Sequence, residues 1–303
     1  MNKEQIAEEM LSCLLAVQRM HPLVHMIPND VTAALCADGI SAIGGRPLMA
    51  QAAEEMEEIT GSACGLAVNL GQPSNEKYKA CKIALATAGT KGIPAVLDPV
   101  GAGASGYRRD AAARLFSVPW SGVLKGNSSE IHTVLTGSLA HTGVDSVGEF
   151  SHEAEAEILL SRMEGQNRRM VIAETGSVDK ILWRDEESGK GKCLLLHHRV
   201  ERPVILVGSG CLTGAVMGAM LAAAWKEKNR SLKETEMALS AAAAVSIISF
   251  CGEYTYTGGI REASRGGYGT YKTALLNALS RFQGEAYKTY MMENLEIQRT
   301  FRN

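Results

Sequence analysis

The sequence predicts an α/β protein with a doubly wound, mostly parallel sheet flanked by helices. Short apolar segments of strand length recur along the chain, and most are followed by a longer segment with helical periodicity. This alternation is typical of βαβ units, because parallel strands need a crossover connection between them. The 303 residues are 46% hydrophobic and 21% charged, a composition that can build a large core. The chain shows no repeat, linker or low-complexity segment, so we expect residues 1–303 to form one domain.

The first part of the chain is expected to begin with a helix and to continue as three strand–helix units. Residues 1–19 place acidic side chains among regularly spaced apolar ones, which indicates an amphipathic helix rather than a signal peptide. The expected strands are 66–70, 94–98 and 122–125, and the expected helices are 75–87, 109–116 and a segment that starts near Asn127.

The second part of the chain adds one more unit, a hairpin and a helical end. Two apolar segments flank a polar turn at residues 185–190, a pattern that predicts a β-hairpin. The tail, residues 285–303, is expected to be a helix that frays. The other expected elements are a charged helix from about 151, a strand at 170–173, hairpin strands at 180–183 and 192–196, a buried helix at 208–225 and helical structure to about 279.

Charge and cysteine content exclude several classes of function. The formal net charge is -2, so nothing in the composition indicates a nucleic acid or an anionic membrane as the main partner. The 7 cysteines form no CxxC pair, which argues against zinc and for reduced thiols in the cytoplasm. The longest apolar runs are too short or too rich in small residues to span a bilayer. We therefore expect a cytoplasmic protein that acts on a small molecule.

Acidic residues follow two of the predicted strands, where open parallel sheets bind their ligands. Asp98 ends a strand and precedes a glycine turn, so it can hold Mg²⁺ directly or through water. An Asp that only caps the turn is the alternative. Glu130 stands on the first turn of the helix that Asn127 can cap, where a carboxylate could organise metal-bound water. A plain capping arrangement explains these two residues equally well. Thr175, at the end of another strand, offers a hydroxyl group.

The segment Gly208–Gly214 is the strongest single indication of phosphate chemistry. Its glycines allow backbone N–H groups to converge at a helix N-terminus, where the helix dipole favours anions. A phosphoryl group in transfer needs such donors around its spreading negative charge. Cys211 stands at the same helix start. Close packing of a buried helix is the alternative explanation for the glycines.

Several motifs taken together resemble those of hydroxyethylthiazole kinase, a thiamine-salvage family of the ribokinase-like superfamily. The most specific of them is Cys211, because most ribokinase-like kinases have an Asp at this position. The resemblance covers about residues 20–282 in unbroken order. It is carried by Pro22–Asp30, Pro47–Ala50, Val68–Gly71, Asp98–Gly103, Lys125–Glu130, Glu174–Gly176, Gly208–Cys211 and Gly266–Tyr271.

The resemblance implies a kinase that uses ATP and Mg²⁺ to phosphorylate 4-methyl-5-(2-hydroxyethyl)thiazole. It also implies a homotrimer with active sites at the subunit interfaces. Cys211 would face the hydroxyl group, with the amides of Gly208, Ser209 and Gly210 around the phosphoryl group. The other implied roles are thiazole contact for Met49, Gly208, Asn29, Gly71 and the Val24–Pro28 loop with Met26, ATP contact for Lys125, Asn127, Thr175 and Gly176, and magnesium contact for Asp98 and Glu130.

The sequence departs from the family pattern mainly near the expected acceptor alcohol. Met26 and Pro28 replace a usual Asn and Thr, and each lost neutral hydrogen bond would cost about 0.5–1.5 kcal/mol if uncompensated. Gln72 and Val207 both stand where Thr is usual. Lys125 stands in place of an Arg, which keeps the charge but gives up bidentate phosphate contact. These changes leave the identity of the acceptor open.

Cys211 could accept the hydroxyl proton or only position the alcohol, and the sequence favours neither role. Two other functions also stay open: a kinase of the same fold acting on a hydroxymethylpyrimidine or pyridoxal-like alcohol, and a weakened thiazole- or nucleotide-binding protein with a regulatory role. His25 is expected to be a core or capping histidine, and His197 and His198 to be solvated. Arg261 and Arg265 are expected to lie in an exposed loop.

Overall fold

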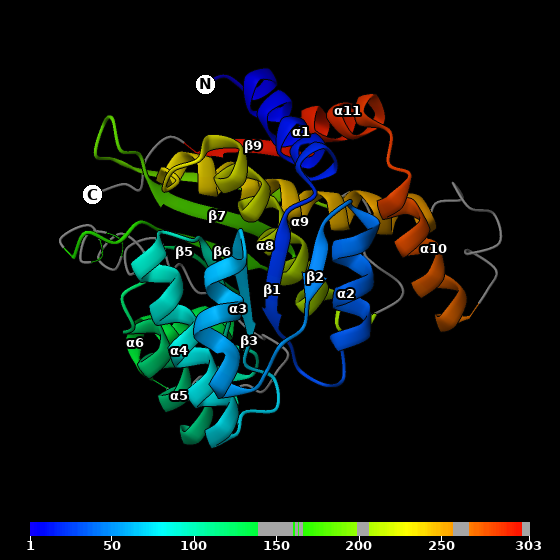
Figure 1. Ribbon diagram of the computed structural model, residues 1–303. Helices are drawn as coiled ribbons and strands as arrows, with labels where there is room; N and C mark the ends of the chain where they lie inside the picture. Colours follow the sequence, from blue (N-terminus) through cyan, green and yellow to red (C-terminus); the bar gives the residue numbers. More distant parts are fainter. Residues whose placement is uncertain (139–159, 161–162, 164–165, 199–205, 257–266, 299–303) are drawn as a thin grey trace.

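The described strands form one nine-stranded sheet, as expected from the alternating pattern. The computed structural model describes residues 1–138, 160, 163, 166–198, 206–256 and 267–298 (Figure 1). The strand order is β2-β1-β3-β4-β5-β6-β7-β8-β9. Strands β1 to β6 pair in parallel, and β7, β8 and β9 add antiparallel neighbours at one side. The strands are β1 Leu23–Ile27, β2 Arg46–Leu48, β3 Gly65–Asn69, β4 Ala95–Asp98, β5 Gly122–Asn127, β6 Met170–Thr175, β7 Val178–Arg184, β8 Gly191–His197 and β9 Leu295–Gln298.

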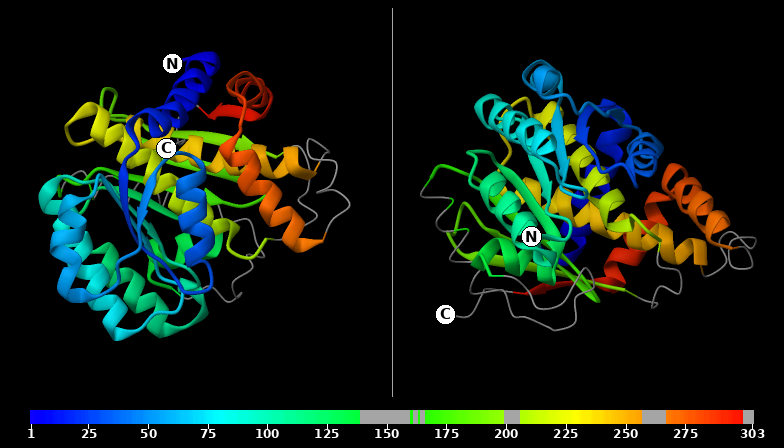
Figure 2. Two further views of the ribbon diagram at one scale, coloured as in Figure 1. Left: turned by 45° about the vertical axis from the view of Figure 1, so that its right-hand side comes forward. Right: turned by 90° about the horizontal axis from the view of Figure 1, so that it is seen from below.

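Helices cover both faces of the sheet, and each face has its own hydrophobic core (Figure 2). One core lies under α3, α4, α5 and α6, and the other lies under α1, α2, α8 and α9. Helix α10 packs on α9 and α2, and α11 packs on α1. The α-helices are α1 Lys3–Met20, α2 Ala33–Ala42, α3 Met56–Ser62, α4 Asn75–Lys91, α5 Gly106–Phe116, α6 Ser128–Thr136, α8 Ser209–Lys228, α9 Glu234–Tyr256, α10 Tyr268–Ser280 and α11 Gly284–Asn294. Two short 3₁₀ turns lie at Ala53–Glu55 and Ala102–Ala104.

Helix α8 lies close to the sheet because small residues face it. A Cβ atom added to Gly218 would lie 3.1 Å from Ala67 of β3, and one added to Gly65 would lie 2.7 Å from Ala222. These contacts let the helix backbone approach the strands without an intervening side-chain layer. The long apolar helix α9 packs against α8. In its most apolar stretch of 18 residues, 83% is buried inside the protein, as in the core helix of a globular domain.

The predicted hairpin and the strand–helix units are confirmed, whereas the end of the chain differs from the prediction. Residues Leu295–Gln298 form strand β9, which pairs with β8, instead of continuing the helix. Neighbouring residues differ in burial, since Ile297 packs on the core and Gln298 stays partly exposed. The free edge of β8 offers a pairing partner to this segment, which explains the strand better than helical periodicity does. Strands β1 and β2 and helices α2 and α3 were not predicted. The expected charged helix from about residue 151 lies almost wholly outside the described residues.

Gly122 begins β5 with a backbone conformation and a spacing that only glycine tolerates. Its φ is +152°, and an added Cβ would lie 1.8 Å from the carbonyl oxygen of Ala95 in β4. Gly189, in the hairpin turn, also has a positive φ of +64°, but the nearest atom to an added Cβ is 3.7 Å away, in Arg184. A substitution at Gly122 would therefore cause both backbone strain and steric overlap, whereas one at Gly189 would cause backbone strain alone.

We predict that Gly122→Ala lowers the free energy of unfolding by more than about 3 kcal/mol, because strain and overlap act together. The matched control Gly189→Ala should lose only about 1 kcal/mol, the cost of the left-handed backbone alone. Denaturant unfolding of the two variants and the unmodified protein measures both values. Equal losses in the two variants would contradict the packing of β5 on β4.

Candidate active site

The polar ends of β3, β4, β5 and β6 meet the N-terminus of α8 around a cavity of about 560 Å³. This is the carboxyl edge of the parallel sheet, where ligands bind in open α/β folds. Most of the residues predicted from the sequence line it. They are Asn29, Gly71, Asp98, Lys125, Asn127, Glu130, Thr175, Gly208, Ser209, Gly210 and Cys211.

A buried ion pair forms the floor of this cavity. Lys125 Nζ lies 3.2 Å from Asp98 Oδ2, and both side chains are almost fully buried. Asp98 Oδ2 also accepts a hydrogen bond from Asn69, whereas its Oδ1 has no partner among the described residues. Burial and the nearby Glu130 carboxylate raise the pKa of Asp98, although Lys125 opposes the shift. Burial by itself lowers the pKa of Lys125, but the carboxylates of Asp98 and Glu130 outweigh it and hold that pKa above its ordinary value.

Glu130 has the capping role considered for it from the sequence, and it also lies on the cavity wall. Its Oε2 accepts the N–H of Asn127 at 2.8 Å, and the Asn127 side chain accepts the N–H of Glu130, so the two residues form a capping box at the start of α6. Its Oε1 accepts the N–H of Gly101 at 2.8 Å. The carboxylate therefore fixes the glycine turn after β4 and, at the same time, lies on the cavity wall.

Glycines at the start of α8 bring the helix N-terminus close to the ion pair. Gly208 has a φ of +92°, and an added Cβ would lie 2.5 Å from Thr32, so a side chain does not fit. An added Cβ on Gly210 would lie 3.2 Å from Lys125 Nζ. The first amides of a helix have no intrahelical acceptor, and here they border a cavity with a cation beneath it. This arrangement suits an anion.

Cys211 lies beside these amides on the wall of the cavity. Its thiol is partly exposed, and the Asn29 side-chain amide lies 3.4 Å from the sulfur. Gln72 and Val207 also line this part of the cavity, and Gln72 accepts a hydrogen bond from the N–H of Asp30. The thiol, an amide and a largely apolar rim therefore surround the space in front of α8.

Four predicted residues do not line the cavity. Val24 and Met26 belong to strand β1 rather than to a loop, and their side chains are fully buried in the core under α8. The prediction of a Val24–Pro28 binding loop is therefore wrong for these two side chains, since they lie within a strand that is covered by hydrophobic core on both faces. Met49 is half-buried against the same core. Gly176 follows Thr175, and its N–H donates to Asp179.

Several cavity or support residues were missed by the sequence analysis. Arg108 and Thr32 line the cavity, and Lys77 Nζ donates to the carbonyl oxygens of Pro28 and Gly71 at 2.6 and 2.7 Å. Burial lowers the pKa of Lys77. Asn69 did carry an indication in the sequence, because it lies in the Val68–Gly71 motif of the family resemblance; in the structure it ends β3 directly opposite Asp98.

The histidines follow the expectation in part. His25 is buried, with ring nitrogens 2.9 Å from Thr60 Oγ1 and 3.2 Å from the carbonyl of Ala50, so it is a core histidine as expected. Its pKa is lowered by burial. His197 is partly exposed and contacts Glu296. His198 was expected to be solvated, and this prediction is wrong. Its side chain is mostly buried, with Nε2 3.0 Å from Asp179 Oδ2. Arg261 and Arg265 lie outside the described residues.

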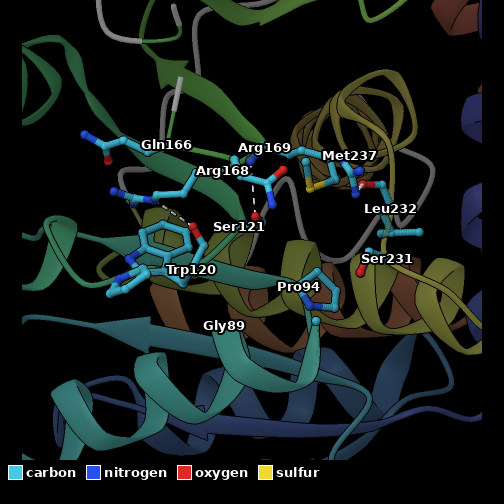
Figure 3. Close-up of a pocket in the computed structure, with 13 residues that line it drawn as sticks. Gly89, Pro94, Trp120, Ser121, Gln166, Arg168, Arg169, Ser231, Leu232 and Met237 are labelled. Atoms are coloured by element: carbon cyan, nitrogen blue, oxygen red, sulfur yellow. Dashed lines mark hydrogen bonds between the residues drawn. The ribbon is translucent and has the colours of Figure 1, made fainter. Parts of the chain in front are cut away.

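A second cavity, of about 340 Å³, lies at the opposite edge of the sheet, where β4, β5 and β6 begin (Figure 3). Arg168 uses its guanidinium there to bind the carbonyl oxygens of Trp120 and Phe116 at 3.0 and 2.9 Å, and it lies over both aromatic rings. These contacts hold the end of α5 against the sheet. The Arg168 side chain at this edge thus has structural partners, unlike Asp98 Oδ1.

The donor set at the carboxyl edge fits magnesium. No group of three or more His, Cys, Asp or Glu side chains within the described ranges could hold a metal ion alone. Mg²⁺ usually takes one or two carboxylates and completes its shell with water and substrate phosphates. The unpartnered Oδ1 of Asp98 and the remaining lone pairs of Glu130 provide such a partial set.

Comparisons with known proteins identify a family for this chain. Residues 14–285 match the model of the Hydroxyethylthiazole kinase family. A relative named Hydroxyethylthiazole kinase 1, from Streptococcus pneumoniae (strain Hungary19A-6), is 31% identical over 282 residues, which cover 92% of this chain and 98% of the relative. The same protein from S. pneumoniae serotype 4 is 30% identical over the same length.

Solved structures extend the likeness to the fold. The structure of a hydroxyethylthiazole kinase protein from Pyrococcus horikoshii OT3 matches with a TM-score of 0.75 and 26% identity, covering 96% of this chain and 100% of that one. A hypothetical protein from Streptococcus mutans, with a TM-score of 0.54 and 13% identity, shares the fold alone. The ribokinase-like α/β fold expected from the sequence is confirmed. The family match over most of the chain, together with a cysteine and a glycine turn at the start of α8, shows that this protein belongs to the hydroxyethylthiazole kinase family.

Proposed function

We propose that this protein transfers the γ-phosphoryl group of ATP to the hydroxyl of 4-methyl-5-(2-hydroxyethyl)thiazole in thiamine salvage. One observation carries the proposal: the Asp98–Lys125 pair lies directly beneath the glycine-rich start of α8, where Cys211 borders the same cavity. Phosphoryl transfer asks for little covalent chemistry from the protein, so aligned groups and neutralised charge should provide most of the catalysis.

The two ends of the cavity have different tasks under this proposal. Lys125, Asn127 and Thr175 hold ATP phosphates, and the amides of Gly210 and Cys211 receive the migrating phosphoryl group. The N–H of Ser209, expected from the sequence to take part, donates instead to the carbonyl oxygen of Leu206 at 3.0 Å. On the other wall, Asn29 and Gly71 border the acceptor, whose hydroxyl faces Cys211. The sulfur either accepts the hydroxyl proton or fixes the direction of the alcohol.

Asp98 and Glu130 would hold the magnesium ion that accompanies ATP. Held by these two carboxylates, the ion would supply positive charge against the negative charge that develops on the phosphates during transfer. The contribution of the protein is to leave one buried carboxylate oxygen of Asp98 without a hydrogen-bond partner among the described residues and to fix Glu130 through two backbone amides.

Of the positions that differ from the family pattern near the expected acceptor, only some have side chains that line the cavity. Met26 is in the core, so its change from the family pattern does not alter the cavity wall. Pro28 contributes its carbonyl to Lys77. Gln72 and Val207 do line the cavity, and they are therefore the positions at which acceptor preference would differ from that of relatives. The thiazole alcohol is favoured over pyrimidine and pyridoxal-like alcohols by the family match.

A cytoplasmic homotrimer is part of the proposal. Val31 and Val207 line the acceptor side of the cavity and are 68% and 61% exposed, which is high for apolar side chains beside a binding site. A second copy of the chain that covers them would complete the acceptor pocket and exclude water from it. Light scattering should give the mass of three chains, and a monomer that is fully active would refute the shared site.

We predict that the protein consumes ATP with hydroxyethylthiazole at a kcat/KM at least tenfold higher than with hydroxymethylpyrimidine or pyridoxine. Product formation measured by ³¹P NMR or coupled ADP release gives these values for each alcohol. A higher kcat/KM with a pyrimidine or pyridoxine alcohol would make that alcohol the acceptor instead of hydroxyethylthiazole. ATP binding without turnover of any alcohol would reject the kinase function.

We predict that Asp98→Asn lowers kcat by about 100-fold, because it removes a charge that faces the metal and the phosphates. The deficit should shrink as the Mg²⁺ concentration rises. Asp110→Asn, which changes a partly exposed carboxylate that contacts Arg109, is the matched control and should keep its activity. A deficit that does not depend on Mg²⁺ would contradict the ligand assignment.

We predict that Cys211→Ser lowers kcat and alters its pH dependence, because an alcohol is a far weaker proton acceptor than a thiolate at neutral pH. Steady-state rates between pH 6 and pH 9 compare the variant with the unmodified enzyme. A parallel profile of reduced height would assign the sulfur a positioning role, and an unchanged profile of unchanged height would remove Cys211 from the mechanism.

A further inference from the structure

Asn69 connects the two sides of the site without lining the cavity. It is the last residue of β3, is 2% exposed and pairs in register with Asp98 of β4. Its side chain lies between the carboxylate of Asp98 and the amide of Asn29, which in turn contacts Cys211. An unbroken series of side-chain contacts therefore runs from the magnesium side to the acceptor side.

Backbone donors fix which way each amide in this series points. The N–H of Gly71 donates to Asn69 Oδ1 at 2.9 Å, and a backbone N–H cannot accept, so the Nδ2 of Asn69 must face Asp98 Oδ2, at 3.2 Å. The N–H of Thr32 likewise donates to Asn29 Oδ1 at 3.0 Å. The Nδ2 of Asn29 therefore donates to Asn69 Oδ1 at 2.9 Å and points at the sulfur. A flipped Asn69 would leave the buried N–H of Gly71 unpaired. A flipped Asn29 would bring its own Oδ1 against Asn69 Oδ1, whereas the N–H of Thr32 would still have the carbonyl oxygen of Asn29 as an acceptor.

This fixed direction has a consequence for Cys211. The sulfur faces an N–H donor, so it acts as the acceptor in that contact. Both oxygens of the two asparagine side chains and both of their donor nitrogens are engaged. The distance between the Asp98 carboxylate and the Cys211 thiol is then set by two buried amides rather than by flexible loops.

We propose that Asn69 is a positioning residue of the kinase, which holds Asn29 and the Gly71 turn, and through them the acceptor hydroxyl beside Cys211, in line with the phosphate held at Asp98. This role rests on the proposed function. Transfer between two bound substrates is sensitive to alignment, and a displacement of about 1 Å can cost about 100-fold in rate. A residue that only caps the end of β3 would affect stability and not this alignment.

The test is the kinetics of Asn69→Ala in the full chain with ATP and the thiazole alcohol. We expect kcat to fall by at least tenfold and the KM for the alcohol to rise, while the KM for ATP changes by less than about threefold, because Lys125 and the α8 amides stay in place. Asn294→Ala is the matched control. Asn294 is also a buried asparagine with one side-chain bond, to the carbonyl of Tyr290, and it lies on α11, away from the cavity. It should lose stability but keep its kcat.

A double-mutant cycle with Asn29→Ala separates a shared arrangement from two independent contacts. The combined variant should be about as slow as the slower single variant, because both changes break the same series. Losses that multiply would overturn the proposal, as would Asn69→Ala kinetics equal to those of Asn294→Ala. If Asn69→Ala does not fold, the similarly sized Asn69→Leu takes its place. It fills the same space but can neither donate to Asp98 nor accept from Gly71 and Asn29, and the same fall in kcat is expected.

The outcomes also distinguish this role from the proposed function. An unmodified protein that phosphorylates no alcohol would reject the kinase function and the role of Asn69 with it. An active protein whose Asn69→Ala variant matches the Asn294→Ala control would reject the role of Asn69 alone.

Discussion

The buried pair of Asp98 and Lys125 is the interaction on which the rest of the site depends. Two charges removed from water are costly unless each is compensated, and here each side chain is almost fully buried and lies 3.2 Å from the other. The pair joins adjacent strands β4 and β5 at their carboxyl ends. Glycines at the start of α8 then allow the helix N-terminus to rest against the pair. Removal of either partner would leave an unpaired charge in the interior, at a cost of about 3–5 kcal/mol.

The two edges of the sheet differ in how completely their buried charged side chains are paired. At the amino edge, Arg168 is satisfied by carbonyl oxygens from the end of α5 and by aromatic rings, so its charge serves the packing of the fold. At the carboxyl edge, Asp98 keeps one oxygen without a partner among the described residues. Native interiors seldom leave a buried carboxylate oxygen unsatisfied, and for this reason we propose this oxygen as a magnesium contact.

Much of the fold could be predicted from the sequence, because the alternation of apolar strands with helices is a local pattern. The hairpin of β7 and β8 was predicted from its polar turn, and the start of α8 from its glycines. Strand β2 has only three residues, too few for a period to be seen. Strand β9 was predicted as helix, since its pairing with β8 joins segments about a hundred residues apart in the chain. Such long-range pairing leaves no local trace.

The residues of the site that could be predicted are those at the end of a strand or in a glycine turn. Asp98, Lys125 and Gly208 belong to such positions, and all three line the cavity. The error at Val24 and Met26 came from treating a strand as a loop, so their alternation toward the core was missed. Lys77 could not be found, because its two carbonyl partners come from other segments and nothing in its own helix marks it.

The decisive experiment is a crystal structure with a non-hydrolysable ATP analogue, magnesium and the thiazole alcohol. We expect the terminal phosphate within hydrogen-bond distance of the Gly210 and Cys211 amides, magnesium at Asp98 Oδ1, and the alcohol oxygen next to the Cys211 sulfur. Phosphates bound at the opposite edge, beside Arg168 and Trp120, or a nucleotide that leaves the start of α8 empty, would contradict this expectation.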